Sequence, residues 1–259
     1  MSLLGNQLSY WKRQLVARLP DSDGVNKQTK TGIFRMSHET VELDQTLYAA
    51  IKHLAEREQC TPFTVLVGVL TVALFDYMGN QDVRIATLAA NRSTAESECV
   101  MGHLMNTLIL RFQVSLVYTI RQFLRQVREQ MIEPFAHQHF SFEELARVLE
   151  SDTGLARESL CQVLFSHQYR RSDVSECSGL TFAPFDLQFL KSEESIGLSI
   201  FDLILRMTAT STELTGAVNY RTETLSGVRV NRIVQVFSKM SQLMVSDTNE
   251  RLSAALMQV

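Results

Sequence analysis

The stretch Ala86–Arg111, ATLAANRSTAESECVMGHLMNTLILR, decides the fold that this sequence predicts. Its apolar runs indicate two strands, Val83–Leu88 and Met105–Phe112, joined by a polar connection. Asn106 and Thr107 are the polar residues that open the second strand. Polar side chains at the entrance of an apolar strand are typical of a strand end that faces a cleft, but an ordinary strand cap gives the same pattern. The stretch alone leaves both interpretations open.

Apolar residues recur at helical spacing on both sides of this stretch. Ser141, with Glu144 three residues later, fits a capping box at the start of one such segment. Pro134 is expected to end the helix that starts after Thr119, because proline removes a helical hydrogen bond and its ring clashes with the preceding turn. The predicted helices are Leu3–Val16, Leu43–Gln59, Pro62–Met78, Ile120–Glu133, Phe142–Glu150 and a long one that begins after Ser226.

Further strands are predicted from runs of apolar and β-branched residues. They lie at Ile33–Met36 with the segment after it, at Leu160–Tyr169, and at Leu198–Met207 and Leu214–Tyr220, which would form a hairpin. The strand Val83–Ala90 is apolar almost throughout, which indicates a sheet covered on both faces. The predicted fold class is therefore α/β (α+β), with a mixed β-sheet flanked by helices.

The composition is that of a folded globular protein. Hydrophobic residues make up 45% of the 259 positions and charged residues 20%, and the formal net charge is −3. This charge gives no global field that would attract nucleic acid or an anionic membrane surface, so neither is expected as a partner. The most apolar run, Val65–Phe75, is shorter than the roughly 20 residues that span a bilayer, and no signal peptide is predicted.

The cysteines are far apart in the sequence and form no CxxC pair; they are Cys60, Cys99, Cys161 and Cys177. A zinc site, a redox motif and a disulfide framework are therefore not predicted. Reduced thiols in the cytoplasm are the expectation.

The histidines give no clear site. His137 and His139 would supply two metal ligands, but no third ligand lies nearby in the sequence, so no metal is predicted. His103 and His167 are interpreted as strand-end histidines with satisfied hydrogen bonds rather than as bases. The sequence contains no GxSxG elbow, Walker glycine loop, GxGxxG or HExxH, so the corresponding hydrolase, NTPase, dinucleotide-binding and zinc-peptidase mechanisms lack their residues.

Three arginines, Arg121, Arg125 and Arg128, lie opposite the apolar stripe of their predicted helix. A solvated helix face and a basic surface for an acidic partner domain both account for this spacing. The sequence does not decide between them.

The order of short motifs along the chain resembles the condensation domain of nonribosomal peptide synthetases. The family patterns include YWxxQL, an ANR turn, IGFFVNTLVLR and HQDLPFE. The similar segments here are YWKRQL (10–15), TPF (61–63), GNQD (79–82), ANR (90–92), MGHLMNTLILR (101–111), HQHFSFE (137–143), RESLCQV (157–163), FDL (201–203) and GAVNY (216–220). Each match is weak alone, and their common order and spacing carry the resemblance.

The resemblance implies the C-terminal lobe of that domain, with a chloramphenicol-acetyltransferase-like fold. Residues 1–30 would be a helix and linker at the lobe junction, and residues 31–259 the lobe itself. A floor segment would lie near Asn91–Glu98, and a latch between Leu160–Tyr169 and the final hairpin. The family's catalytic motif, HHxxxDG, belongs to the N-terminal lobe, and none of the six histidines here is adjacent to another. The chain is therefore predicted to hold no catalytic residue of its own and to be inactive without an N-terminal lobe.

By the same resemblance, the chain would form the acceptor side of the substrate tunnel and a docking face for carrier proteins. Its substrates would be thioesters on the phosphopantetheine arms of peptidyl and aminoacyl carrier proteins, with no cofactor bound directly. The predicted tunnel residues are Asn106, Arg92, Gln138 and Thr107, and the predicted structural residues at the lobe junction are Asp202 and Arg111.

Two other functions stay open. A degenerate lobe would serve as a scaffold without turnover, and the apolar face that it exposes predicts self-association as a homodimer. The third interpretation is an acyltransferase of the same superfold with another histidine as its base, for which His137 is the candidate. His139 replaces the Asp of HQDLPFE, a departure that bears on the acceptor side of the tunnel.

Overall fold

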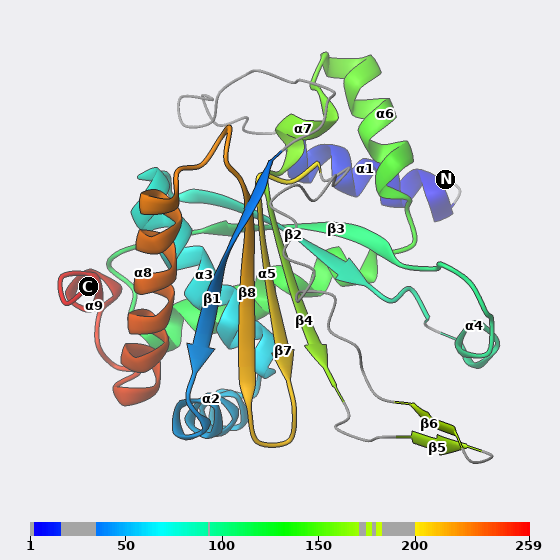
Figure 1. The fold of residues 1–259 in the computed structure, drawn as a ribbon. Helices are drawn as coiled ribbons and strands as arrows, with labels where there is room; N and C mark the ends of the chain where they lie inside the picture. The colour runs from blue at the N-terminus through cyan, green and yellow to red at the C-terminus, as the bar shows by residue number, and fades with distance from the viewer. Residues whose placement is uncertain (1–2, 17–34, 93, 171–174, 178–179, 183–199) are drawn as a thin grey trace.

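The computed structural model describes residues 3–16, 35–92, 94–170, 175–177, 180–182 and 200–259 (Figure 1). The helices are α1 (Leu3–Val16), α2 (Gln45–Arg57), α3 (Pro62–Met78), α4 (Ala95–Glu98), α5 (Ile120–Ala136), α6 (Phe142–Thr153), α7 (Arg157–Leu160), α8 (Gly227–Ser246) and α9 (Leu252–Leu256). The strands are β1 (Met36–Leu43), β2 (Asp82–Ala89), β3 (Asn106–Gln113), β4 (Val163–Tyr169), β5 (Ser175–Cys177), β6 (Leu180–Phe182), β7 (Leu203–Ala209) and β8 (Leu214–Arg221). The predicted fold class, a mixed sheet flanked by helices, is confirmed.

The main sheet has the strand order β1-β8-β7-β4-β2-β3, and β5 and β6 form a separate two-stranded ribbon. β7 and β8 form the predicted antiparallel hairpin, while β4 is parallel to both β7 and β2. The β2–β4 ladder holds only the pairs Ala86↔Leu164 and Thr87↔Phe165. In Figure 1, β2 and β3 run across the direction of the other strands, so β2 and β4 separate soon after they pair.

One face of the sheet is covered by α2, α3, α5 and α8 (Figure 1). The helix α3 is apolar nearly all round, and its residues 64–74 are all buried in the centre of this layer. Both of its predicted ends are confirmed. The Thr61 hydroxyl accepts from the Thr64 N–H, and Gly79 adopts a φ of 66° that ends the helix. No single described helix is long and apolar enough to cross a membrane, and α2 with α3 pass that test only as a pair bent by 106°.

The described helices cover the opposite face of the sheet only in part. The helices α1 and α6 pack over the β2–β3 side and enclose a second apolar core, which includes Trp11, Leu15 and Phe142. On β7 and β8, buried side chains alternate with more accessible ones, and Arg206 and Thr215 are exposed. The expectation of a sheet covered on both faces therefore holds for β2, whereas the described helices leave this face of β1, β8 and β7 uncovered, and the polar alternation there suits contact with water.

Pro134 does not end its helix as predicted. The helix α5 continues through Ala136, and the His137 N–H still donates to the Glu133 carbonyl at 3.1 Å. The proline is buried in the last turn of the helix, so its missing N–H interrupts a ladder that is about to end.

The predicted capping box at the start of α6 is also wrong. Ser141 stands at the N-cap position, but its side chain makes no capping hydrogen bond, and Glu144 pairs instead with Arg147 at 3.7 Å. Leu43 was predicted as the start of a helix, but it is the last residue of β1. The helix α2 begins at Gln45, and the side chain of Asp44 caps its N-terminus.

Several short elements were not predicted from the sequence: α4, α7, α9 and the ribbon of β5 and β6. The ribbon lies in the interval where the resemblance places a latch, and α4 lies in the interval of the floor. The predicted strand starts at Ile33 and Leu198, and the boundary at residue 30, lie outside the described residues.

We predict that Gly216→Ala lowers the free energy of unfolding by about 1–3 kcal/mol through overpacking. Gly216 in β8 pairs with Met207 of β7 and Val41 of β1. A Cβ at Gly216 would stand 2.5 Å from the Met207 sulfur and 3.0 Å from the Val41 Cβ.

Urea denaturation measures the loss of unfolding free energy in Gly216→Ala. The control is Ala217→Ser at the next position, on the other face of the strand, which should change stability by less than about 0.5 kcal/mol. Equal midpoints for the two variants would contradict the overpacking.

Candidate functional site

Asn106 joins the start of β3 to the loop before α6. Its amide Nδ2 donates to the carbonyls of Gln138 and Phe140, both at 2.7 Å. Its Oδ1 accepts from the N–H of Phe142 at 3.1 Å. Asn106 therefore provides the N-terminal cap that Ser141 does not. The structure brings the predicted tunnel residues Asn106 and Gln138 together through the Gln138 backbone.

Arg92 lies in the connection between β2 and β3 and binds three backbone carbonyls of that same connection. Its guanidinium donates to the carbonyls of Ser97 at 2.5 Å, Val100 at 2.7 Å and Gly102 at 3.1 Å. These contacts wrap the chain around the short helix α4, which begins with a capping box of Thr94 and Ser97. The side chain of Arg92 thus holds backbone in place within the segment that the resemblance identifies as the floor.

Thr107 follows Asn106 in β3 and pairs with Leu88 of β2. Thr107 is half-buried, whereas Leu88 and Met105 beside it are 37% and 50% exposed. All four predicted tunnel residues therefore lie around one end of the β2–β3 pair, Arg92 in the connection and Gln138 in the loop that Asn106 holds. Whether they line a tunnel stays a prediction.

His137 is engaged in structural contacts. Its ring stacks on Tyr10 of α1 with centroids 4.0 Å apart, and its Nδ1 lies 2.9 Å from the Glu133 carbonyl. The indole of Trp11 donates to the His137 carbonyl at 3.1 Å. These contacts place the YWKRQL segment against the HQ segment and fix the orientation of the His137 ring through its Nδ1 atom.

The remaining histidines of interest have different surroundings. The Nδ1 atom of His139 lies 2.8 Å from the side-chain oxygen of Asn91, so its ring has a different partner from that of His137. His103 is exposed in the connection before β3. The Nε2 atom of His167 is buried with no hydrogen-bond partner among the described residues, so the expectation of a satisfied histidine is wrong there. Within the described ranges, no three His, Cys, Asp or Glu side chains are grouped to hold a metal ion.

Arg111 binds the C-terminal end of α1 to the sheet. It makes a bidentate ion pair with Asp82, with both N–O distances 2.7 Å, and donates to the Gln14 carbonyl at 2.6 Å. The neighbouring Arg84 donates to the Leu15 carbonyl at 3.2 Å. Burial lowers the pKa of Arg84, and the charge of Asp82 opposes this shift. Two arginines therefore satisfy carbonyls that the end of a helix leaves unpaired.

Asp202 lies at the start of β7. Its carboxylate is 3.2 Å from Arg221 and accepts from the Thr224 hydroxyl at 3.1 Å. Burial raises the pKa of Asp202, while the Arg221 charge and the Thr224 bond lower it. Asp202 and Arg111 thus belong to two different ion pairs on β7–β8 and β2–β3, and the structure does not bring them together.

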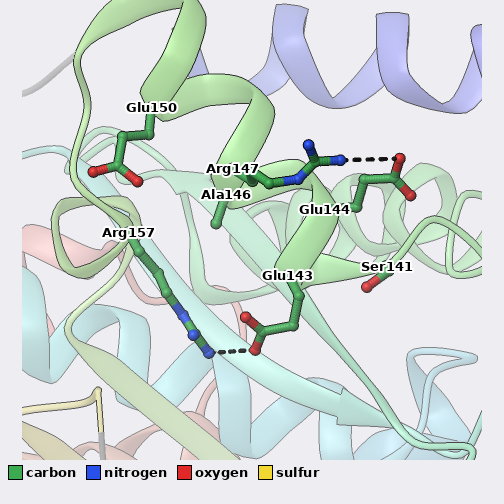
Figure 2. A pocket seen from close by; sticks show the side chains of 7 residues that line it. All are labelled: Ser141, Glu143, Glu144, Ala146, Arg147, Glu150 and Arg157. Atoms are coloured by element: carbon green, nitrogen blue, oxygen red, sulfur yellow. Dashed lines mark hydrogen bonds and ion pairs between the residues drawn. The ribbon is translucent and has the colours of Figure 1, made fainter.

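A shallow hollow on the outer side of α6 and α7 contains charged side chains that pair with one another. Figure 2 shows Glu143 directed at Arg157 and Glu144 at Arg147, as ion pairs. The lining residues are Ser141, Glu143, Glu144, Ala146, Arg147, Glu150 and Arg157. Two of its three carboxylates are paired with its two arginines on an exposed surface, which gives this hollow no evident chemistry.

The arginine row on α5 is mostly a packing contact. Arg121 pairs with Glu58 at 3.1 Å and donates to the Thr248 hydroxyl, and Arg128 donates to the Gln59 carbonyl at 3.1 Å. Arg125 is exposed. Two of the three arginines therefore hold α5 against the end of α2, an arrangement that neither sequence interpretation included.

Sequence reasoning gave no individual role to Asp82, Arg84 or Thr224, and it expected the hydrogen bonds of His167 to be satisfied. Arg84 had a usable signal, because a charged residue inside the apolar run VRIATLA must find partners if that strand is buried. The partners themselves come from α1, which is distant in sequence.

Comparison with known proteins gives one family. A family model described as "Condensation domain" matches residues 3–258. A linear gramicidin synthase protein of Brevibacillus parabrevis is 30% identical over 249 residues, which cover 94% of this chain and 5% of that protein. The chain spans between 3% and 6% of the length of the first curated relatives that it matches.

Solved structures share the fold. The condensation domain of Monacolin K polyketide synthase superposes with a TM-score of 0.74 at 16% identity, covering 96% of this chain and 59% of that one. The X-domain from teicoplanin biosynthesis gives a TM-score of 0.76 at 17% identity, covering 97% and 57%. At these identities the likeness concerns the fold alone.

Replacement of Asn106 should loosen the loop before α6. Asn106→Ala removes all three hydrogen bonds, whereas Asn106→Asp keeps the acceptor for the Phe142 N–H and turns an oxygen toward two carbonyls. We expect each variant to lose about 1–3 kcal/mol of stability. The Phe142 amide should exchange faster with deuterium in the Ala variant than in the Asp variant. Equal exchange rates would show that Asn106 is not the cap of α6.

Loss of the Arg111 side chain should release α1 from the sheet. Trp11, the single tryptophan, is 2% exposed on α1 and reports this contact by fluorescence. We expect Arg111→Met to shift its emission to the red and to lower stability by about 3 kcal/mol, because Asp82 loses its partner in a buried site. The control is Lys12→Met, which breaks the exposed Lys12–Asp152 pair between α1 and α6 and should cost less than about 1 kcal/mol. Identical emission in both variants would refute the role of Arg111.

Proposed function

This chain belongs to the condensation domain family, and we propose that it is the C-terminal lobe of such a domain in a nonribosomal peptide synthetase. The observation that carries the proposal is the family match over residues 3–258 in a sequence without adjacent histidines. The chain covers 59% of a solved condensation domain, and its main sheet forms one α/β layer structure, which supports a single lobe.

The proposed lobe takes part in amide bond formation without supplying the base. A group that moves a proton at the attacking amine must lie within about 3 Å of it, directly or through one water. The residues of the HHxxxDG motif would come from an N-terminal lobe, upstream or in trans. The role of this chain is then to shape the acceptor side of the tunnel and to hold the partner lobe.

The two sets of predicted residues take distinct parts in this proposal. Asn106 and Arg92 fix the loop and the floor segment that border the tunnel, and Thr107 and Gln138 stand at its wall. Arg111 fixes α1, the element proposed at the lobe junction, and Asp202 fixes the entrance to β7. Most of these side chains would act through the backbone that they hold.

The proposed substrates are thioesters carried on phosphopantetheine by peptidyl and aminoacyl carrier proteins. The pantetheine arm belongs to the substrate, and the proposal includes no cofactor bound by this chain. Carrier docking on this lobe and a cytoplasmic location complete the proposal.

The test is a peptide-bond assay with this chain, a separately expressed N-terminal lobe that bears HHxxxDG, and the loaded cognate carrier proteins. We expect product only when both lobes are present. Replacing the second histidine of the motif by alanine in the added lobe should lower the rate by about 100-fold or more, within the range of general acid–base catalysis.

Each other outcome of this assay supports a different function. Lobe association or carrier binding without product would favour the scaffold. Self-association of this chain alone, measured by sizing with light scattering, would support the homodimer of that alternative. Turnover by this chain alone that His137→Ala abolishes would support the acyltransferase and overturn the proposed lobe.

A further inference from the structure

A hollow of about 300 Å³ opens where β2 and β4 separate. Their ladder ends at Thr87 and Phe165, while β4 continues beside β7 as far as Tyr169. Phe63 from the start of α3 and Phe135 from the end of α5 contribute to its wall. The hollow therefore arises from the strand arrangement of this lobe itself and needs no second lobe to form it.

The wall of this hollow is largely apolar, and among the described residues no Asp, Glu, Lys or Arg lines it. The Phe63 ring centroid lies 6.5 Å from those of Phe135 and His167. Leu88 and Met105 are its large accessible apolar members. A flat or branched apolar group gains from such a wall. A charged group would lose its hydration there without meeting an opposite charge.

The hollow also carries uncharged hydrogen-bonding groups. Its polar lining residues are Thr87 and Ser166, which are buried, and His167 and the exposed Gln168. His167 is one of the lining residues, and burial lowers the pKa of its imidazole, but its Nε2 atom is enclosed and has no hydrogen-bond partner among the described residues. A mostly apolar cavity with a few polar groups is the usual form of a small-molecule site.

We propose that this hollow is a subsite for one uncharged apolar or aromatic side chain of a thioester-bound amino acid. Its volume is at the lower end of the roughly 300–1,000 Å³ found for small-molecule sites, which suits a side chain better than a whole peptidyl group. The preference for a neutral apolar group follows from the residues that line the hollow. The inference that this group belongs to an aminoacyl thioester rests on the proposed function.

The subsite gives a role to a motif that the catalytic argument leaves unused. Thr61 and Pro62 start α3, and this start places Phe63 at the wall. The strand-end stretch supplies Leu88 and Met105 from the other side. Two segments of the family resemblance thus meet in one cavity.

The test compares pantetheine amides of phenylalanine, leucine, glutamate and lysine as probes, by calorimetric titration into the 259-residue chain. We expect the phenylalanyl and leucyl probes to bind at least tenfold more tightly than the two charged probes. Met105→Trp, at a position 50% exposed, should fill the entrance and weaken phenylalanyl binding at least tenfold. Met101→Trp makes the same change at a position 98% exposed outside the hollow, and should leave the affinity unchanged.

Thermal unfolding of each variant checks that it is folded, and Leu88→Trp is a second way to fill the hollow. Equal affinity for all four probes, no binding of the phenylalanyl probe, or unchanged affinity in both filled variants would overturn the subsite. Because this titration needs no partner lobe, its result is separate from the peptide-bond assay. Selective binding without product in that assay would keep the subsite and remove only the proposed function.

Discussion

The contact on which the rest of this structure depends is the bidentate ion pair of Arg111 and Asp82 at the end of α1. Each of these side chains is 11% exposed, so each would be costly without the other. Arg111 also donates to the Gln14 carbonyl, and the neighbouring Arg84 donates to the Leu15 carbonyl, near the end of α1 where a helix cannot satisfy its carbonyls internally. The result is a polar anchor at one end of an otherwise apolar contact. It fixes the register of α1, so that Trp11 enters the second core and donates to the loop that ends α5. An apolar face alone would allow α1 to slide, whereas the anchor permits one position.

The same logic extends along β3 from Arg111 to Asn106. Both residues point their donors at backbone carbonyls of distant segments, Arg111 at α1 and Asn106 at the loop before α6. Arg92 does this for the floor segment. Polar residues in a motif are commonly read as chemical groups, but here three of them hold backbone in shape. A substitution at these positions would therefore alter the wall of the proposed tunnel even if the side chain never met a substrate.

The sequence was sufficient for elements whose cause is local. An apolar helix between Thr61 and Gly79 carries its own start and stop signals, and the hairpin of β7 and β8 follows from two adjacent apolar runs. The sequence was insufficient for elements whose ends are determined by a residue distant in the chain. The cap of α6 comes from Asn106, more than thirty residues earlier, so the local pattern of Ser141 and Glu144 misled. The prediction at Pro134 was wrong because a proline in the last turn of a helix removes only one hydrogen bond near the end of the ladder. The hollow could not be predicted, because it depends on the number of residue pairs between β2 and β4, and no local sequence pattern indicates that number.

The distribution of apolar surface bears on where this chain could meet a partner. The half of the sheet that the described helices leave uncovered is lined by residues such as Arg206 and Thr215, which suit water. The exposed apolar side chains Val100, Met101 and Met105 lie instead around the connection of β2 and β3. This connection is the segment that Arg92 braces from within. A surface that is apolar yet held in one shape before contact loses little conformational entropy when a partner covers it. The physical case for an interface is therefore stronger at the connection of β2 and β3 than on the sheet face that the described helices leave uncovered.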